Sequence, residues 1–307
     1  MQAVLILAHK NIDQVIELSQ RLSSCFNVYI HFDKKVSLSE KQELSLKKLN
    51  VNFFSKYDVK WGSYSIVRAT IDLMKLALEN PKNKYFHLIS GQDWPMKAPQ
   101  KIYDFFEDTN KIYMNYWRAL DMKKTGEPEI WWVKYYFNYD QINRRTTFGK
   151  IYHRFLLLIQ TIGRVNKLKK YGVNEKDIYA GQEWVDVPRD ALEYAIKYYE
   201  IHPELEKIFS TSFCSDEIWL QSILCNSQYK DRIDRDIHHY IEMTEKHGSR
   251  PAILDEDDYD KINKGNYWWG RKIERPVSNK LINLLDQQKI NLTKAKGFLK
   301  HGRPFLI

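Results

Sequence analysis

The sequence predicts an α/β fold with a mostly parallel central sheet flanked by helices. Residues 3–9, AVLILAH, form a continuous apolar run that is typical of a strand buried on both faces. Up to about residue 110, such runs alternate with segments of helical periodicity, which favours a parallel sheet with right-handed crossovers. No Pro/Gly/Ser linker and no repeat interrupts the chain, so we expect one domain over residues 1–307.

In the first part of the chain, strands and helices are expected in strict alternation. Pairs of residues at capping-box spacing, Asn11 with Gln14 and Ser37 with Glu40, predict the starts of the first two helices. Apolar residues at helical spacing predict a third helix over residues 63–80. The expected strands are residues 3–9, 27–33, 51–55 and 85–90.

The order beyond residue 110 is less regular. Expected here are strands over residues 111–117 and 179–187, and helices over 189–200, 216–226 and 277–287. We accordingly divide the domain into a nucleotide-binding half (1–110), an acceptor and catalytic half (111–287) and a basic tail (288–307).

The composition narrows the class of protein. An excess of 48 Lys and Arg over 39 Asp and Glu gives a net charge of +9, which suits an anionic partner such as nucleic acid, lipid or a phosphorylated ligand. Aromatic residues make up 14% of the chain and either fill a Tyr-rich core and surface or stack on a sugar or nucleotide. Cys25, Cys214 and Cys225 fit neither a disulfide framework nor a zinc site, so we expect a reducing compartment. The N-terminal apolar run is too short for a signal sequence or a membrane span.

The carboxyl ends of the predicted strands are the expected ligand-binding edge, because open α/β sheets bind ligands there. Those ends carry His9, the segment from His31 to Asp33, and the segment from Ser90 to Asp93. His31 and Asp33 are two residues apart, so on a strand they share one face. The first glycine of the chain is Gly62, which excludes a glycine-rich phosphate loop after the first strand.

Two pairs of charged residues are candidates for chemistry. Ser215 is a good N-cap that would put Asp216 and Glu217 in a first helical turn. There the acids either offset the helix dipole or supply a general base whose pKa the dipole lowers. Arg271 and Lys272 are either an ordinary solvated pair or fixed cations that neutralise a diphosphate leaving group without a metal.

Two longer segments also have a charge pattern. Residues 254–261, LDEDDYDK, contain Asp-x-Asp spacings suited to a divalent ion, although a solvated acidic loop is favoured. Residues 144–171 carry eight basic residues and no acid, with the apolar run 155–159 among them. This pattern predicts a basic amphipathic helix that either lies on an anionic membrane surface or packs on the core with a basic outer face.

Six segments of the chain stand in an order shared with one enzyme family. They are VYIHFDKK (28–35), VKWGSYSIVRATIDLMKLAL (59–78), YFHLISGQDWPMKAPQKIYDFF (85–106), YAGQEWVDVPRDALEY (179–194), CSDEIWLQSIL (214–224) and NYWWGRKI (266–273). In these segments the chain resembles the core-2/I-branching enzymes, a family that includes peptide O-xylosyltransferases. The resemblance implies a GT-A-type glycosyltransferase fold and inverting transfer from a UDP-sugar. It also implies that the usual Asp-x-Asp metal site is absent and that no cofactor is needed.

The resemblance implies roles for individual residues by motif match. Glu217 would be the catalytic base. Arg271, Lys272 and Arg250 would bind the UDP diphosphate, and Asp33 would lie near the uridine. The other expected donor-binding residues are His9 and His31, and the expected floor of the donor and acceptor sites comprises Trp61, Ser90, Asp93, Trp94, Lys97, Gln182, Trp184 and Asp216. The segment HYIEM (239–243) departs from the family, whose members often carry Arg and Trp there.

The principal hypothesis is a cytoplasmic bacterial glycosyltransferase of surface polysaccharide synthesis. It would move a sugar, N-acetylglucosamine by first choice, from a UDP-sugar to a hydroxyl of a glycan or lipid-linked glycan. UDP-xylose, UDP-galactose and UDP-glucose are alternative donors. Peripheral contact with the inner face of the plasma membrane through residues 144–171 is a further expectation. The competing hypotheses are a single-strand nucleic-acid-binding protein, for which no RNA-binding motif is found, and a catalytically inactive sugar-binding relative.

Overall fold

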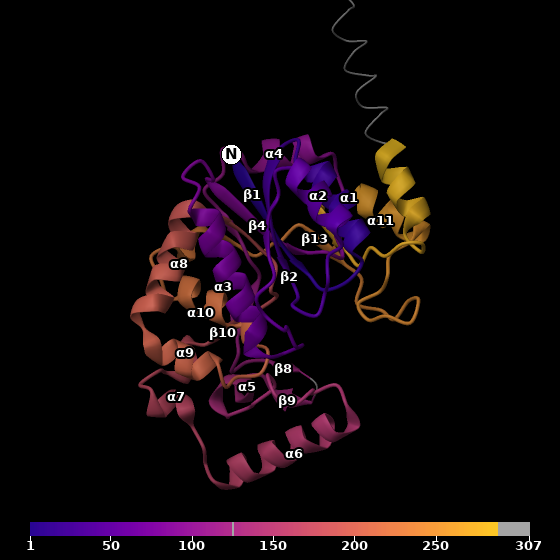
Figure 1. Cartoon of the computed structure of the whole chain (residues 1–307). Helices are drawn as coiled ribbons and strands as arrows, with labels where there is room; N and C mark the ends of the chain where they lie inside the picture. Colours follow the sequence, from indigo (N-terminus) through magenta and orange to yellow (C-terminus); the bar gives the residue numbers. More distant parts are fainter. Residues whose placement is uncertain (125, 288–307) are drawn as a thin grey trace, which may run out of the picture.

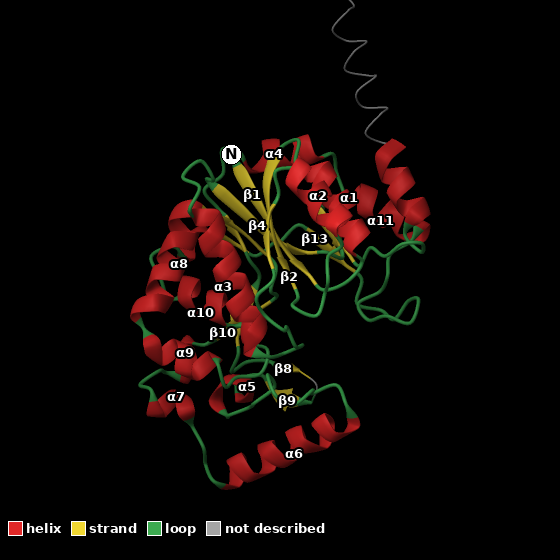
Figure 2. Ribbon diagram, viewed as in Figure 1, coloured by secondary structure: helices red, strands yellow, loops and turns green. Residues whose placement is uncertain are grey.

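The computed structural model describes residues 1–124 and 126–287 as a mixed α/β protein with helices on both faces of a central sheet (Figures 1 and 2). The α/β prediction is therefore confirmed. The expected basic tail, residues 288–307, lies outside the described residues. Within the described part of the chain, no helix combines the length and the apolar character needed to cross a membrane.

The central sheet has seven strands. They are β1 (Gln2–Ala8), β2 (Phe26–Phe32), β3 (Asn52–Phe54), β4 (Tyr85–Ser90), β6 (Ile112–Tyr113), β11 (Val185–Pro188) and β12 (Ile233–Asp234). Their order is β12-β6-β11-β4-β1-β2-β3. The first four are parallel, β11 runs antiparallel between β4 and β6, and β12 is parallel to β6. The sheet is mainly parallel, and its parallel core is built from the apolar runs of the first part of the chain.

Side chains of the strands alternate between two hydrophobic cores, one on each face of the sheet. From β1, Ala3 and Leu5 enter one core, and Val4 and Ile6 enter the other. The first core is covered by α3 (Tyr64–Leu78), α8 (Arg189–Ile201) and α10 (Trp219–Cys225), and the second by α1 (Ile12–Leu22), α2 (Glu40–Lys48) and α4 (Pro99–Phe106). Both faces of β1 are thus buried, which explains why its sequence is apolar without alternation.

Smaller elements lie around the carboxyl edge of the sheet. A three-stranded sheet joins β5 (Asp93–Pro95), β13 (His239–Ile241) and β14 (Trp269–Arg271), so late segments of the chain lie against the turn that follows β4. Two strand pairs are β7 (Tyr116–Arg118) with β10 (Tyr179–Gly181), and β8 (Lys123–Lys124) with β9 (Glu127–Pro128). The other helices are α5 (Trp131–Lys134), α6 (Thr147–Ile162), α7 (Lys167–Lys170), α9 (Pro203–Phe209), α11 (Tyr259–Lys264) and a last one over 279–287. The short 3₁₀ turns are η1 (Glu175–Asp177), η2 (Ser215–Glu217), η3 (Lys230–Arg232) and η4 (Glu256–Asp258).

Several expected boundaries are wrong. Asn11 does not cap α1 with its side chain, and Gln14 instead donates to the backbone carbonyls of Gly91 and Ile273 at 3.2 and 2.9 Å. The capping box of α2 is formed by Ser39 and not by Ser37. The expected strands 111–117 and 179–187 are each divided into two strands that belong to different sheets.

Gly62 connects the start of α3 to the segment that leads into η2. It has φ +71°, and the carbonyl of Gly62 accepts a 2.9 Å hydrogen bond from the N–H of Cys214. A Cβ on Gly62 would lie 2.4 Å from Cε2 of Phe213. Glycine is therefore required here both by the left-handed backbone and by the close approach of the Phe213 ring.

We predict that Gly62→Ala destabilises the protein by more than the backbone cost alone. The left-handed conformation costs about 1–2 kcal/mol for a non-glycine residue, and displacing Phe213 adds roughly 1–3 kcal/mol. Gly172→Ala is the matched control, because Gly172 has φ +73° with nothing within 4 Å of an added Cβ. Urea unfolding of both variants measures the difference, and equal losses would contradict the prediction.

Candidate active site

Asp93, in the turn after β4, is the buried anchor of the site. It accepts hydrogen bonds from the backbone N–H of Ser90 and, at 2.5 Å, from the Ser90 hydroxyl. On its other side, Nε2 of His239 and Nε of Arg271 lie 2.8 and 3.7 Å from Asp93 Oδ1. Burial raises the pKa of Asp93, but the charge of Arg271 and the hydrogen bonds from His239 and Ser90 outweigh burial, so the pKa is lowered. The Asp93 carboxylate is therefore fully buried and contacts Arg271. The sequence led us to expect that it would face a ligand instead.

Arg271 and Lys272 lie at the end of β14 as neighbouring cations. The guanidinium carbon of Arg271 is 4.2 Å from the ring centroid of the buried Trp184. Lys272 Nζ donates to the hydroxyl of Ser249 at 3.0 Å. Burial lowers the pKa of Lys272, and the charges of Arg271 and Lys10 lower it further. The charge of Glu274 opposes this effect, and an incoming anion would relieve the remaining repulsion among the cations.

Lys10 and Arg145 are two further cations of the site that sequence reasoning missed. Lys10 Nζ pairs with Glu274 at 2.7 Å, and the charge of Arg145 is among those that act on Lys272. The Arg145 guanidinium carbon is 4.8 Å from the ring centroid of the exposed Trp61. The available signals were the position of Lys10 just after the first strand and that of Arg145 in the basic segment 144–171.

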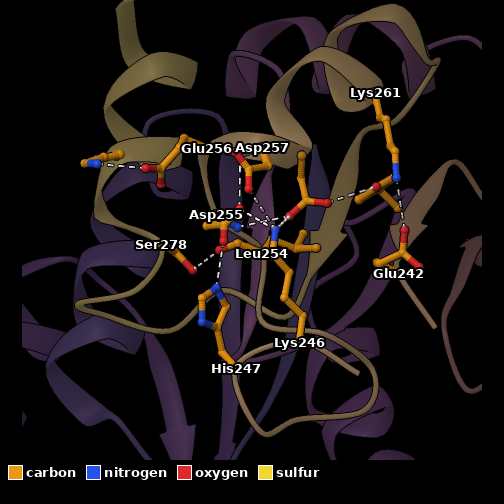
Figure 3. Close-up of polar contacts among 12 residues, drawn as sticks. Glu242, Lys246, His247, Leu254, Asp255, Glu256, Asp257, Lys261 and Ser278 are labelled. Carbon is orange, nitrogen blue, oxygen red and sulfur yellow. Dashed lines mark hydrogen bonds and ion pairs between the residues drawn. The ribbon is translucent and has the colours of Figure 1, made fainter. Parts of the chain in front are cut away.

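The acidic run after residue 254 binds the loop that carries Lys246 and His247 (Figure 3). Asp255 pairs with Lys246 and, at 2.6 Å, with Nε2 of His247, while Asp258 lies 3.1 Å from Lys246 Nζ. Asp255 also caps η4. Both carboxylates are thus engaged by protein cations, and they fix the loop from which Ser249 contacts Lys272. Across the described residues, no group of three or more His, Cys, Asp or Glu side chains is arranged to hold a metal ion.

Three expected site residues have surroundings that the sequence did not predict. Nε of Arg250 donates to a backbone carbonyl in its own loop at 3.0 Å, and no described contact joins it to Arg271 or Lys272. Burial and the charge of Lys101, one helical turn away on α4, lower the pKa of Lys97. Trp94 is fully buried beneath the guanidinium of Arg21. Trp94 can support the floor of a site from within the core, but it cannot contact a ligand.

His9, His31 and Asp33 lie where the sequence put them, at the ends of β1 and β2. The His31 ring is buried, and Nε2 accepts a 3.3 Å hydrogen bond from the N–H of Tyr57. Burial lowers the pKa of His31 to about 4, so its ring is neutral and acts as an acceptor. His9 is the most exposed member of this group. Partial desolvation lowers its pKa, the charge of Arg271 also lowers it, and the charge of Asp33 opposes both effects.

Glu217 lies in η2, where it is half-buried and paired with a lysine that sequence reasoning missed. Lys124 Nζ lies 3.0 Å from Glu217 Oε2 and 3.0 Å from Glu129 Oε1. The prediction that Ser215 caps a helix and that a dipole lowers the pKa of Glu217 is wrong. Cys214 precedes a single 3₁₀ turn, and α10 begins after it. Burial raises the pKa of Glu217, with Lys124 opposing this effect and Glu129 reinforcing it, which makes the carboxylate a stronger base than an exposed glutamate.

Two more carboxyl groups stand beside Glu217. Burial raises the pKa of Asp216 well above its ordinary value, and the charges of Glu183 and Glu217 add to the effect. Burial likewise raises the pKa of Glu183 to about 7, with Arg271 opposing and Glu217 reinforcing. Oxygens of Gln182, Glu183 and Asp216 are buried without a hydrogen-bond partner among the described residues. Since buried polar atoms are normally paired, this cluster marks a place for a ligand.

Cations and carboxylates therefore face the same part of the molecule. The charges of Arg271 and Glu217 both act on Glu183. The arrangement offers cations for a phosphorylated donor and a carboxylate base for an attacking hydroxyl. Fold and site together define a glycosyltransferase.

The chain belongs to the core-2/I-branching enzyme family, whose model matches residues 3–263. Membership of this family agrees with the expected GT-A-type fold. No protein with a curated description matches the chain.

Several solved glycosyltransferase structures have low similarity to the chain. The galactosyltransferase LgtC, in complex with donor and acceptor sugar analogues, is 9% identical with a TM-score of 0.41, over 89% of this chain and 88% of that one. The bifunctional glycosyltransferase WbbM is 10% identical with a TM-score of 0.37, over 89% of this chain and 46% of that one. S. aureus TarS 1–349 in complex with UDP is 14% identical with a TM-score of 0.27, over 37% of this chain and 35% of that one.

We predict that Lys124→Met shifts the acid limb of the pH–rate profile to higher pH. Glu217 must be ionised to accept a proton, and Lys124 lowers its pKa, so loss of that charge raises the pKa further. A shift of about one pH unit corresponds to roughly 1.4 kcal/mol of lost charge stabilisation. Lys123→Met is the control, because Lys123 is the exposed neighbour on β8. Rates measured from pH 5 to 9 test this, and an unmoved acid limb in Lys124→Met would contradict it.

Proposed function

We propose that this protein is an inverting glycosyltransferase that transfers a sugar from a UDP-sugar to a hydroxyl of a glycan or lipid-linked glycan, without a divalent cation. The observation that carries the proposal is that the charges of both Glu217 and Arg271, the neighbour of Lys272, act on the buried Glu183. Family membership supports the general reaction. The chemistry of the side chains supports the finer assignment.

In the proposed reaction, Glu217 accepts the proton of the acceptor hydroxyl as its oxygen attacks the anomeric carbon. The new carbon–oxygen bond forms on one face of the sugar while the bond to the UDP phosphate breaks on the other. The electron pair of that bond leaves with UDP, whose diphosphate gains negative charge. Arg271 and Lys272, with Lys10 and Arg145 nearby, supply fixed positive charge where that negative charge develops.

Metal independence is supported by how the charged groups are used. The Asp255 and Asp258 carboxylates are bound to Lys246, so they serve the loop and do not need a divalent ion for neutralisation. Besides burial, the charges of Arg271, Lys10 and Arg145 lower the pKa of Lys272, while the charge of Glu274 opposes them. A diphosphate complements this cluster without an added metal.

We infer N-acetylglucosamine as the transferred sugar, with xylose, galactose and glucose as alternatives, and bacterial surface polysaccharide synthesis as the role. An acceptor of this kind is met in the cytoplasm, at the inner face of the plasma membrane.

The nucleic-acid hypothesis is weaker, because the aromatic residues that suggested base stacking are packed in the core. Trp132, Tyr135, Phe137 and Tyr139 are all buried.

Substitution of the base is expected to separate catalysis from binding. Glu217→Gln keeps the size of the side chain but cannot accept the proton, so transfer should fall by about 10²–10⁴-fold. UDP affinity should change little, because the cations are untouched. Glu245→Gln, an exposed residue away from η2, is the control. Radiolabelled sugar transfer and calorimetric UDP titration measure the two effects, and retained turnover would remove Glu217 from this role.

Removal of one cation is expected to weaken UDP binding. Lys272→Met should raise the Kd for UDP by roughly 10–100-fold, since a charge-assisted hydrogen bond contributes about 1.5–3 kcal/mol. Lys280→Met is the control, because Lys280 is 77% exposed and paired with Glu256.

A panel of UDP-sugars assayed with EDTA or with manganese tests the metal requirement, and activity that depends on manganese would overturn the metal-free mechanism.

A further inference from the structure

Helix α6 is held against the protein by one face only. Nε2 of His153 lies 2.9 Å from Glu127, and the other ring nitrogen is bonded to the Tyr139 hydroxyl. The Gln160 side chain exchanges hydrogen bonds of 2.7 and 3.0 Å with the backbone of Tyr136. These buried polar contacts fix the rotation of the helix about its axis. The direction in which its other face points is therefore defined.

The opposite face of α6 is apolar and exposed. Six of its side chains are among the 13 large hydrophobic side chains that are exposed in the described residues: Phe148 (65%), Ile151 (66%), Phe155 (56%), Leu158 (59%), Ile159 (42%) and Ile162 (73%). Their spacing of three, four and seven residues puts them in one stripe along the helix. In Figure 1, α6 lies at the edge of the molecule beyond β8 and β9, with this helix outermost. A contiguous apolar stripe of this size marks a surface that a partner covers.

The charges around the stripe identify the partner. Residues 144–171 contain no acid, and the exposed cations Lys150 and Arg154 flank the stripe, with Arg164 beyond its end. Lys167 is an exception, because it is buried and donates to Ser212, Thr211 and a backbone carbonyl. A second copy of this helix would bring like charges together, whereas an anionic lipid surface attracts all of them.

We propose that α6 lies in the interface of an anionic lipid bilayer, with the stripe from Phe148 to Ile162 in the acyl boundary and the flanking cations at the phosphates. An amphipathic helix of this kind binds in the plane of the membrane and does not span it. The surface binds the bilayer whether or not the enzyme transfers sugars.

The same geometry brings the site to the membrane, an inference that rests on the proposed function. Arg145, just before α6, stacks on Trp61, and its charge acts on Lys272. His153 of α6 contacts Glu127 of β9. Strand β9 pairs with β8, and Lys124 of β8 forms an ion pair with Glu217. Glu217 is thus linked to α6 through a series of direct contacts, and Lys272 is linked to it through the charge of Arg145. An acceptor whose lipid tail stays in the bilayer can present its hydroxyl on this side.

Vesicle sedimentation tests the surface with the full chain. The protein should bind vesicles of 70% phosphatidylcholine and 30% phosphatidylglycerol. Its partitioning onto vesicles of pure phosphatidylcholine should be lower by about tenfold or more. Ile151→Ser with Ile162→Ser tests the stripe, and Lys150→Glu with Arg154→Glu tests the cations. The charge-reversal pair should lower partitioning by about 25-fold or more, at roughly fivefold per basic residue near the surface. Leu44→Ser with Lys48→Glu, exposed on α2, is the matched control and should bind as the unchanged protein does.

Other outcomes would overturn the proposal. These are binding that is equal for neutral and anionic vesicles, binding that the α6 variants retain, and absence of binding to either vesicle. Sedimentation velocity of the protein without lipid provides a further check, since a dimer that the α6 variants dissociate would assign the stripe to a second copy. Calorimetric UDP titration of the same variants should be unchanged. If the unchanged protein binds UDP but not vesicles, only the membrane proposal is overturned. If it binds vesicles but not UDP, only the proposed nucleotide site is overturned.

Discussion

The contact between Asp93 and Arg271 is the constraint on which the rest of the site depends. Asp93 is a fully buried charge, and a buried carboxylate is tolerated only when it is paired and hydrogen-bonded. Its partners come from the end of β4, from β13 and from β14, so one carboxylate joins the end of the parallel sheet to the late segments of the chain. Arg271 is thus held between the Asp93 carboxylate and the ring of Trp184.

Opposed charges on the two sides of the site then set the chemistry. Among Lys10, Arg145, Arg271 and Lys272, repulsion favours an anion, while burial of the carboxylates near Glu217 favours their protonated forms. Lys124, whose Nζ lies 3.0 Å from Glu217 Oε2, opposes the second effect at Glu217. The pKa of the proposed base therefore reflects burial and a positive charge that act in opposite directions.

The sequence predicted the parallel core well and the site only in part. Strands β1, β2 and β4 were predictable because burial on both faces leaves a continuous apolar signature. Residues 111–117 and 179–187 were not, because a bend between two short strands of different sheets leaves no local pattern. Glu217, Arg271 and Lys272 came from the motif resemblance. Lys124, Glu183 and Arg145 were missed because only long-range packing brings them near these residues, and the direction of Arg250 depends on a loop carbonyl that spacing cannot reveal.

Some of the motifs that identify the family have a structural role in this chain, and others contain the proposed reactive groups. In WGS (61–63), Trp61 stacks with Arg145, and Gly62 leaves room for the Phe213 ring. Gly62 also accepts from Cys214, which fixes the chain just before Asp216 and Glu217. The family signature in the α3 region therefore positions a segment that lies far along the sequence and carries the proposed base. A change at Gly62 would disturb the segment before Glu217 without touching any ligand, so the motif serves the geometry of the proposed base as well as the fold.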